Sequence, residues 1–233
     1  VPGVSGQVSD PSMVIPLEEN SELAPGEDAA SRIAGNLFLR VETSRRTCYV
    51  GEGLMATYKL YSRLNASSQV LRRPSLTGFS VTEMVDAYDS RPVIETLNGI
   101  PYYVNLIRKV QLFPLQAGLY VLDPAEVESV IHFIKWKEGV RKVRLPFDYT
   151  IHLRTDPVPV RVLPLPADKQ PPDFRGAVGQ FSISTRVMGQ AQHAGDLVKI
   201  RVRVEGTGNI PLLTAPLVKW PRGVDTADPS VME

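Results

Sequence analysis

The chain has 233 residues, of which 43% are hydrophobic and 22% are charged, and this balance excludes wholesale disorder. The formal net charge is +1, so the chain as a whole sets up no strong field that would attract nucleic acid or an anionic membrane. The 20 prolines argue against a helix-rich fold, because proline interrupts helix interiors and is favoured in turns, linkers and strand edges.

Residues 1–35 have the composition of an N-terminal tail or linker. Turn and coil formers come first, and an acidic stretch without hydrophobic periodicity follows from Glu18 to Asp28. Such a stretch buries too little apolar surface to offset the entropy lost on ordering. We therefore expect residues 1–35 to be largely disordered. Local docking of Met13–Leu17 and one helical turn at Asp28–Arg32 remain open.

From Asn36 the pattern becomes that of β-strands. In the segment Leu54–Tyr61 the alternate residues Leu54, Ala56, Tyr58 and Leu60 face one way, which is typical of a strand with one buried face. Asn98-Gly99 is the favoured pair for a two-residue hairpin turn. Residues 36–162 are therefore predicted to form one antiparallel, immunoglobulin-like β-sandwich. Its expected strands are Leu37–Thr43, Thr47–Val50, Leu54–Tyr61, Arg91–Leu97, Ile100–Phe113, Leu119–Leu122, Val127–Trp136 and Val143–Leu153.

A proline-rich linker is expected at residues 163–175, and the pattern after it repeats the earlier module. The repeat matches Gly179–Ser184 to Asn36–Val41, Ala194–Asp196 to Val50–Glu52, and Leu197–Val204 to Leu54–Tyr61. The second copy stops after its first half. The expected fold class is all-β, with tandem immunoglobulin-like antiparallel β-sandwiches of which the second, residues 176–233, is incomplete.

The residues that could support catalysis or metal binding favour structural roles. No nucleophile-elbow, zinc-protease or phosphate-loop motif is present. Cys48 is the only cysteine, so neither an internal disulfide nor a cysteine-based zinc site can form, and a buried strand thiol is the favoured interpretation. His132 and His152 lack a third ligand at a suitable spacing, and His193 lies in an expected exposed turn. We predict a protein that is not an enzyme, with no catalytic residues, cofactor or metal.

Two charged segments have a functional and a structural interpretation. Glu83, Asp86, Asp89 and Glu95 surround Tyr88 in a segment that is either a solvated acidic loop or a loop offering a carboxylate to a partner's metal ion. The basic run from Lys135 to Arg144 includes Trp136, as in some nucleic-acid sites. The near-neutral chain and the balancing Glu138 favour a solvated hairpin, so we expect no nucleic-acid partner.

An ordered set of motifs resembles a middle module of BatD, the bacterial aerotolerance-operon protein. The resemblance covers about residues 36–233. It is carried by Asn36–Val41, Tyr49–Glu52, Tyr58–Tyr61, Leu106–Gly118, Leu122–Val127 and Gly208–Leu213, together with Pro216, Pro221 and Asp228-Pro229.

The resemblance implies a periplasmic scaffold or interaction module linked to oxygen tolerance and envelope stress. It also implies partners with von Willebrand factor A domains and a membrane anchor outside residues 1–233, in keeping with an excised soluble fragment that begins at Val1. Because such domains often hold Mg²⁺ with an open coordination position, Asp86 and Asp89 are the predicted partner contacts.

Two functions of other classes remain open. One is a cell-surface adhesin or carbohydrate-binding module that uses Tyr88, Tyr102 and Tyr103. The other is a thiol oxidoreductase that uses Cys48, which burial of the thiol would exclude.

Overall fold

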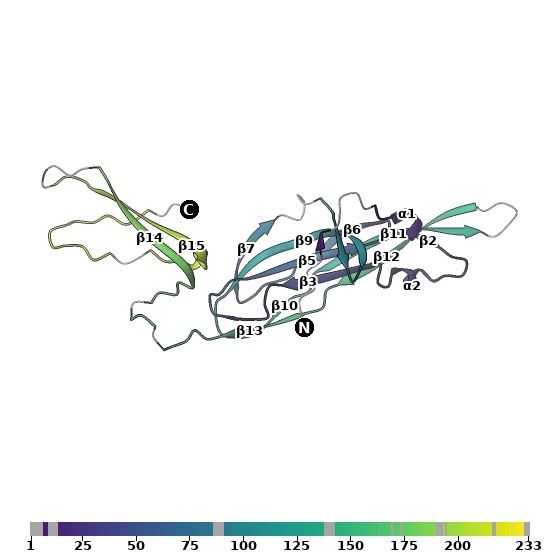
Figure 1. Ribbon diagram of the computed structural model, residues 1–233, viewed down its shortest axis with the longest axis horizontal. Helices are drawn as coiled ribbons and strands as arrows, with labels where there is room; N and C mark the ends of the chain where they lie inside the picture. The colour runs from purple at the N-terminus through teal and green to yellow at the C-terminus, as the bar shows by residue number, and fades with distance from the viewer. Residues whose placement is uncertain are drawn as a thin grey trace.

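A computed structural model describes residues 7–8, 14–85, 91–137, 143–168, 170–172, 174–189, 193, 195–215 and 218–230 (Figure 1). Among the described residues, 55% lie in strands and 6% in helices, so the predicted all-β class is confirmed. The strands form a sandwich over the first two thirds of the chain, followed by a separate two-stranded hairpin.

One layer of the sandwich is a six-stranded sheet in the order β1-β8-β9-β5-β3, with β7 also paired to β9. The first part of the long strand β9 pairs with β8, and its last part pairs with β7. The bounds are β1 Gln7–Val8, β3 Leu37–Thr43, β5 Leu54–Ser62, β7 Phe79–Val85, β8 Val93–Leu97 and β9 Ile100–Pro114.

The facing layer is built from two long, interrupted strands. A three-residue break separates β10 from β11, and a second three-residue break separates β12 from β13. The two breaks are joined by hydrogen bonds: the Ala125 amide donates to the Thr155 hydroxyl, and the Thr155 amide donates to the Ala125 carbonyl. Short strands complete this layer, with β6 and β2 beside β11 and β4 beside β13. The bounds are β2 Glu22–Leu23, β4 Thr47–Tyr49, β6 Ala66–Arg72, β10 Gly118–Leu122, β11 Glu126–Lys137, β12 Val143–Arg154 and β13 Val158–Leu163.

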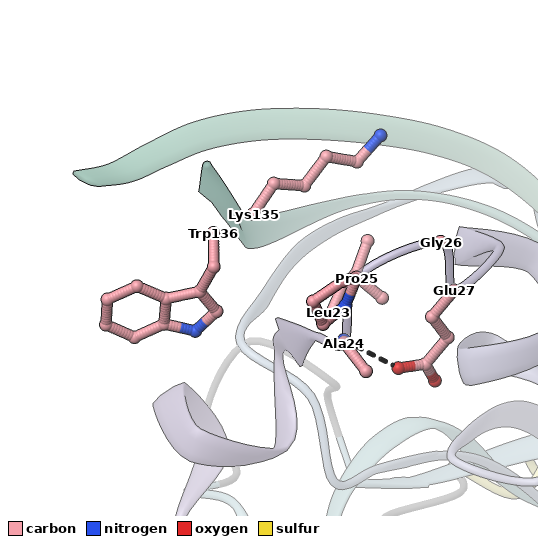
Figure 2. A pocket seen from close by; sticks show the side chains of 7 residues that line it. All are labelled: Leu23, Ala24, Pro25, Gly26, Glu27, Lys135 and Trp136. Carbon is pink, nitrogen blue, oxygen red and sulfur yellow. Dashed lines mark hydrogen bonds between the residues drawn. The ribbon is translucent and has the colours of Figure 1, made fainter. Parts of the chain in front are cut away.

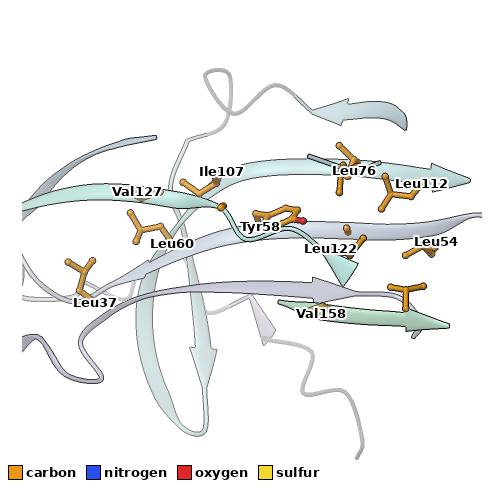
Figure 3. Close-up of a cluster of buried hydrophobic side chains, with 14 of the residues drawn as sticks. Leu37, Leu54, Tyr58, Leu60, Leu76, Ile107, Leu112, Leu122, Val127 and Val158 are labelled. Carbon is orange, nitrogen blue, oxygen red and sulfur yellow. The ribbon is translucent and has the colours of Figure 1, made fainter. Parts of the chain in front are cut away.

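The core lies between these layers and follows the predicted alternation. Leu54, Ala56, Tyr58 and Leu60 of β5 are each at most 2% exposed. Leu54, Tyr58 and Leu60 point toward the facing layer (Figure 3). They pack against β9, β10, β11 and β13 residues such as Leu112. The predicted Asn98-Gly99 hairpin is also confirmed: Leu97 pairs with Ile100, and Asn98 and Gly99 have φ of 52° and 80°. Positive φ at both positions is what a two-residue turn of this hand requires.

Residues 14–35 are ordered, so the expectation of a largely disordered tail is wrong for this part. The segment contains α1 (Leu17–Asn20), β2 and α2 (Ala29–Ile33). Asp28 caps α2 by accepting a hydrogen bond from the Ser31 amide at 3.1 Å, which fits the helical turn left open above. Four scattered apolar residues of the segment are buried: Ile15, Leu23, Ala29 and Ile33. Their burial on the sandwich supplies the stabilisation that the segment's own composition lacks.

The C-terminal hairpin consists of β14 (Gly179–Met188) and β15 (Lys199–Gly208), and a short 3₁₀ helix, Ile210–Leu212, follows it. No strand or helix occurs in the described residues 164–168 and 170–172, where the proline-rich linker was expected. The hairpin contacts the sandwich where Val178 and Asn209 lie close to Gly51. Asn209 joins the hairpin to the linker by accepting from the Val178 amide and donating to the Gly176 carbonyl, at 2.8 and 2.7 Å.

The hairpin repeats the β3–β5 hairpin of the sandwich at a constant spacing. Leu39 pairs with Leu60, and 144 positions later Ile183 pairs with Val204; every other pair of β3 and β5 has a counterpart at the same spacing. The turns agree as well. Glu52 accepts from the Tyr49 amide at 2.9 Å, and Asp196 accepts from the His193 amide at 2.9 Å.

This spacing corrects the repeat alignment made from sequence. Matching Phe181 to Phe38 and Leu197 to Leu54 is wrong by one residue. Such a slip exchanges the two faces of a strand, because side chains alternate with a period of two. In the structural alignment Phe181 corresponds to Leu37 and Val198 to Leu54, so the apolar residues of both copies lie on the same face.

Candidate functional site

The predicted partner contacts Asp86 and Asp89 lie outside the described residues, but the strands on both sides of them are placed. β7 ends at Val85 and β8 begins at Val93, and both strands pair with β9. Glu83, in the same acidic segment, accepts a hydrogen bond from Arg108 at 2.5 Å. Its carboxylate is therefore engaged within the sheet.

Glu95 departs most from the sequence expectation. The expected solvated acidic loop is wrong at this position, since Glu95 lies in β8 and is 6% exposed. Lys59 of β5 donates to both of its carboxylate oxygens, at 2.9 and 3.0 Å. A buried charge needs such a partner, because transfer of an isolated carboxylate out of water is strongly unfavourable.

A buried polar cluster forms around this pair on the sheet face that points away from the core. Lys59 also lies 2.9 Å from a carboxylate oxygen of Glu42 in β3. The Tyr61 hydroxyl is 3.0 Å from Glu95 and 3.2 Å from Glu42. Because a hydroxyl has one proton, Tyr61 donates to only one of these carboxylates at a time. Lys59 lies 2.9 Å from both carboxylates, and Arg40 forms a longer, 3.8 Å pair with Glu42.

The pKa shifts in the cluster support a structural role. Burial alone would lower the pKa of Lys59, but hydrogen bonds to Glu42 and Glu95 outweigh burial and raise that pKa. Burial and the same two carboxylates raise the pKa of Tyr61. Lys59 therefore stays charged and Tyr61 stays neutral near neutral pH, so neither is poised for proton transfer. The sequence pattern offered no signal for this cluster beyond three charged residues and a tyrosine on strands.

Aromatic rings cover one side of the cluster, and they do not form the surface proposed for carbohydrate binding. Phe38 stacks on Tyr61 with centroids 5.0 Å apart, and the Tyr102 ring meets both edge-on. Tyr102 is buried and donates to the Gly35 carbonyl at 3.0 Å. Tyr103 is the next residue of the same strand and points to the opposite face. The two tyrosines are not brought together, and Tyr88 lies outside the described residues.

Cys48 is buried, as predicted from its place on an apolar strand. It lies on β4 among core residues and is 2% exposed. Burial raises the pKa of the thiol, and the nearby Arg45 offsets only part of this effect. A thiol nucleophile needs access and a lowered pKa, so the oxidoreductase interpretation has no support at this position.

The histidines lie at the surface in polar pairs. His132 lies 2.8 Å from Asp148 and 3.0 Å from Ser67, and His152 lies 3.0 Å from Glu128. His193 is exposed in its turn, as expected. Within the described ranges, no group of three or more His, Cys, Asp or Glu side chains is placed to hold a metal ion.

The basic run at the end of the β11–β12 ribbon is tied to the N-terminal segment. Trp136 donates to Glu22 at 3.2 Å, Arg144 pairs with the same carboxylate, and the Lys135 ammonium lies 4.0 Å from the centroid of the Phe147 ring. A small pocket lies beside Trp136 (Figure 2), lined by Leu23, Ala24, Pro25, Gly26, Glu27, Lys135 and Trp136. Its volume of about 200 Å³ is below the ~300–1,000 Å³ typical of small-molecule sites.

The C-terminal hairpin exposes one apolar face. We define its apolar face by the alternating residues Phe181, Ile183, Val187, Ile200, Val202 and Val204. Val198 and Val204 are 41% and 42% exposed, whereas Leu54 and Leu60, at the equivalent positions of the first copy, are 1% and 2% exposed. The hairpin thus exposes a surface that the same module buries in its complete form.

Comparison with protein-family models, curated proteins and solved structures finds no match. Among the residues that the structure describes, no helix is long and apolar enough to cross a membrane.

Proposed function

We propose that this chain is a non-enzymatic, tandem-module scaffold that binds other proteins, as the resemblance to BatD implies. The observation that carries the proposal is the repeat of one β-module at a constant 144-residue spacing, with an exposed apolar face on the second copy. Repetition of a rigid module separates binding surfaces along a chain, and exposed apolar sheet faces are typical of protein interfaces.

The proposed setting is the periplasm, with the parent protein anchored in the inner membrane outside residues 1–233 and linked to oxygen tolerance and envelope stress. The proposed partners are membrane proteins with von Willebrand factor A domains. In this proposal Asp86 or Asp89 completes the coordination shell of the partner's Mg²⁺, since a hard cation prefers an oxygen ligand. Support comes from the frame around them: β7 and β8, both paired to β9, hold the two ends of this segment.

The test is a binding titration of the 233-residue chain against purified A domains from the same operon. The proposal expects saturable binding in Mg²⁺, loss of binding in EDTA, and loss with the Asp86→Ala/Asp89→Ala double variant. The matched control is Asp148→Ala, which removes an exposed carboxylate from β12.

The outcomes separate the two parts of the proposal. Binding that survives both EDTA and the double variant refutes the carboxylate mechanism and leaves the partner class supported. An absence of binding to every A domain of the operon refutes the partner class.

A further inference from the structure

One edge of the hairpin β14–β15 is formed by β15, whose equivalent strand in the first sandwich is paired on both sides. In the first sandwich the sheet order ends at β3, whereas β5 pairs on its other side with β9. The equivalent of β5 is β15, and within the described chain β15 pairs only with β14. An unpaired strand edge presents backbone N–H and C=O groups in line, which is the arrangement that an added strand recognises.

The two faces of β15 have opposite chemistry. Ile200, Val202 and Val204 lie on the apolar face, and the alternating residues Lys199, Arg201 and Arg203 lie on the other. Arg186 of β14 pairs directly with Arg201 and adds to this basic face. Within the described residues, the ion pair on this face joins Arg203 to Glu205 at 2.7 Å. The face therefore carries an excess of positive charge.

The first copy shows how the module accommodates a cation at this position. Lys59 lies 144 positions before Arg203, and it is neutralised by Glu42 of β3 and by Glu95 of β8. In the second copy Arg186 occupies the position of Glu42, so the neighbouring strand repels Arg203 where it attracts Lys59. Glu205 compensates only one of the four cations on this face, so further carboxylates must come from outside the hairpin.

A second copy of the chain fits this surface poorly. Two strands of ten residues present a face of roughly 300 Å², so two hairpins stacked face to face bury about 600 Å², less than the ~1,200 Å² of stable interfaces. Edge-to-edge self-pairing centred on Val202 sets Arg201 opposite Arg203 of the second copy, and like charges directly opposite are destabilising.

We infer that β15 is a docking edge for an extended polypeptide segment in which apolar residues alternate with Asp or Glu. The segment pairs antiparallel with β15, as β9 pairs with β5. Its apolar residues extend the exposed apolar face, and its carboxylates lie opposite Arg201 and Arg203. This inference does not depend on the A-domain partner or on Asp86 and Asp89.

The experiment titrates the full 233-residue chain with a labelled synthetic peptide in which Val and Glu alternate, and with a matched peptide in which Lys replaces Glu. The Glu peptide is expected to bind about tenfold more tightly, from two cross-strand charge pairs that change sign between the peptides. The Arg201→Glu/Arg203→Glu variant should reverse the preference. The control Arg161→Glu, an exposed change on β13, should leave it unchanged.

Hydrogen exchange locates the contact. Amides of residues 199–208 should gain protection with the Glu peptide, and those of the open strands β3 and β12 should not. Equal affinity for the two peptides, no saturable binding, or protection elsewhere overturns the inference. Sedimentation without peptide gives a further refuting outcome. If it shows a dimer that Arg203→Glu dissociates, the occupant of the edge is a second copy and the inference is wrong. The wild-type comparison of the two peptides keeps the test decisive even if the double variant unfolds.

Discussion

Replacing Lys59 by methionine should expose how strongly the buried cluster depends on its single ammonium group. Lys59 donates to Glu95 at 2.9 and 3.0 Å and lies 2.9 Å from Glu42. One substitution therefore leaves Glu95 without its cation and Glu42 with only its longer, 3.8 Å pair to Arg40. Methionine fills a similar length of side chain, so the change mainly removes charge. The Tyr61 hydroxyl can compensate only one carboxylate.

The magnitude follows from the burial of the partners. Removing one member of a buried ion pair costs about 3–5 kcal/mol of unfolding free energy. The Lys59 and Glu42 side chains remain 16% and 26% exposed, so water relieves part of this cost. We therefore expect Lys59→Met to lose about 2–4 kcal/mol. The matched control is Arg154→Met, whose 3.6 Å pair with Glu126 is 65% and 33% exposed and should contribute at most about 1 kcal/mol.

The assay is urea unfolding followed by Trp136 fluorescence in a Trp220→Phe background, so that the signal reports the first sandwich. With a urea dependence of about 2 kcal/mol per molar, the midpoint should fall by about 1–2 M for Lys59→Met. The difference should shrink at acid pH, where protonation removes the unpaired negative charges. A midpoint shift no larger than that of Arg154→Met would refute the reasoning, since the cluster would then behave as a solvated surface pair.

Three further predictions use matched changes elsewhere. Cys48 should react slowly with a thiol reagent in the folded chain and rapidly in urea, and fast labelling of the folded wild type would contradict its burial. The control variant Cys48→Ser/Tyr49→Cys moves the thiol to an exposed neighbouring position and should react rapidly in the folded chain. Gly51→Ala places a Cβ on a backbone with φ +72° and 3.0 Å from Asn209, so it should loosen the contact between the hairpin and the sandwich, measured as faster hydrogen exchange there. Gly99→Ala, with φ +80° and nothing within 4 Å of the added Cβ, is the control for backbone strain alone. Hydrogen bonds to Glu42 and Glu95 raise the pKa of Lys59 in the folded chain above its ordinary value, so the stabilisation by Lys59 is complete below the ordinary pKa and is lost as pH rises through the folded one. Alkaline titration should therefore weaken the wild type more than Lys59→Met.

The sequence predicted the parts of the fold that depend on local pattern. Alternation along Leu54–Tyr61 identified the buried face of β5, and Asn98-Gly99 identified a turn that needs positive φ at both positions. Both signals act through the backbone of adjacent residues. They require no knowledge of which distant strand lies alongside.

The features missed from sequence depend on distant contacts. Glu95 belongs to an acidic segment by composition, but its environment is set by Lys59, 36 residues earlier and on another strand. Residues 14–35 look unable to fold alone, yet Leu23 is buried because β2 pairs with β11, more than a hundred positions later. Composition describes what a segment can do in isolation, and tertiary packing overrides it in both cases.

The two copies of the module separate the determinants of fold from those of interaction. At a spacing of 144 residues the core-facing pairs keep their apolar character, as Leu39–Leu60 becomes Ile183–Val204, so both copies form the same hairpin. The other face keeps no such pattern, because Glu42 is replaced by Arg186 while the cation at Lys59 persists as Arg203. Burial constrains the first face in the complete sandwich, whereas the charge on the second face depends on what lies against it. The charges on this face balance in the first copy, whereas the second copy has an excess of positive charge. We therefore expect this face of the second copy to contact an acidic surface, and the difference in affinity between the matched Glu and Lys peptides measures this preference directly.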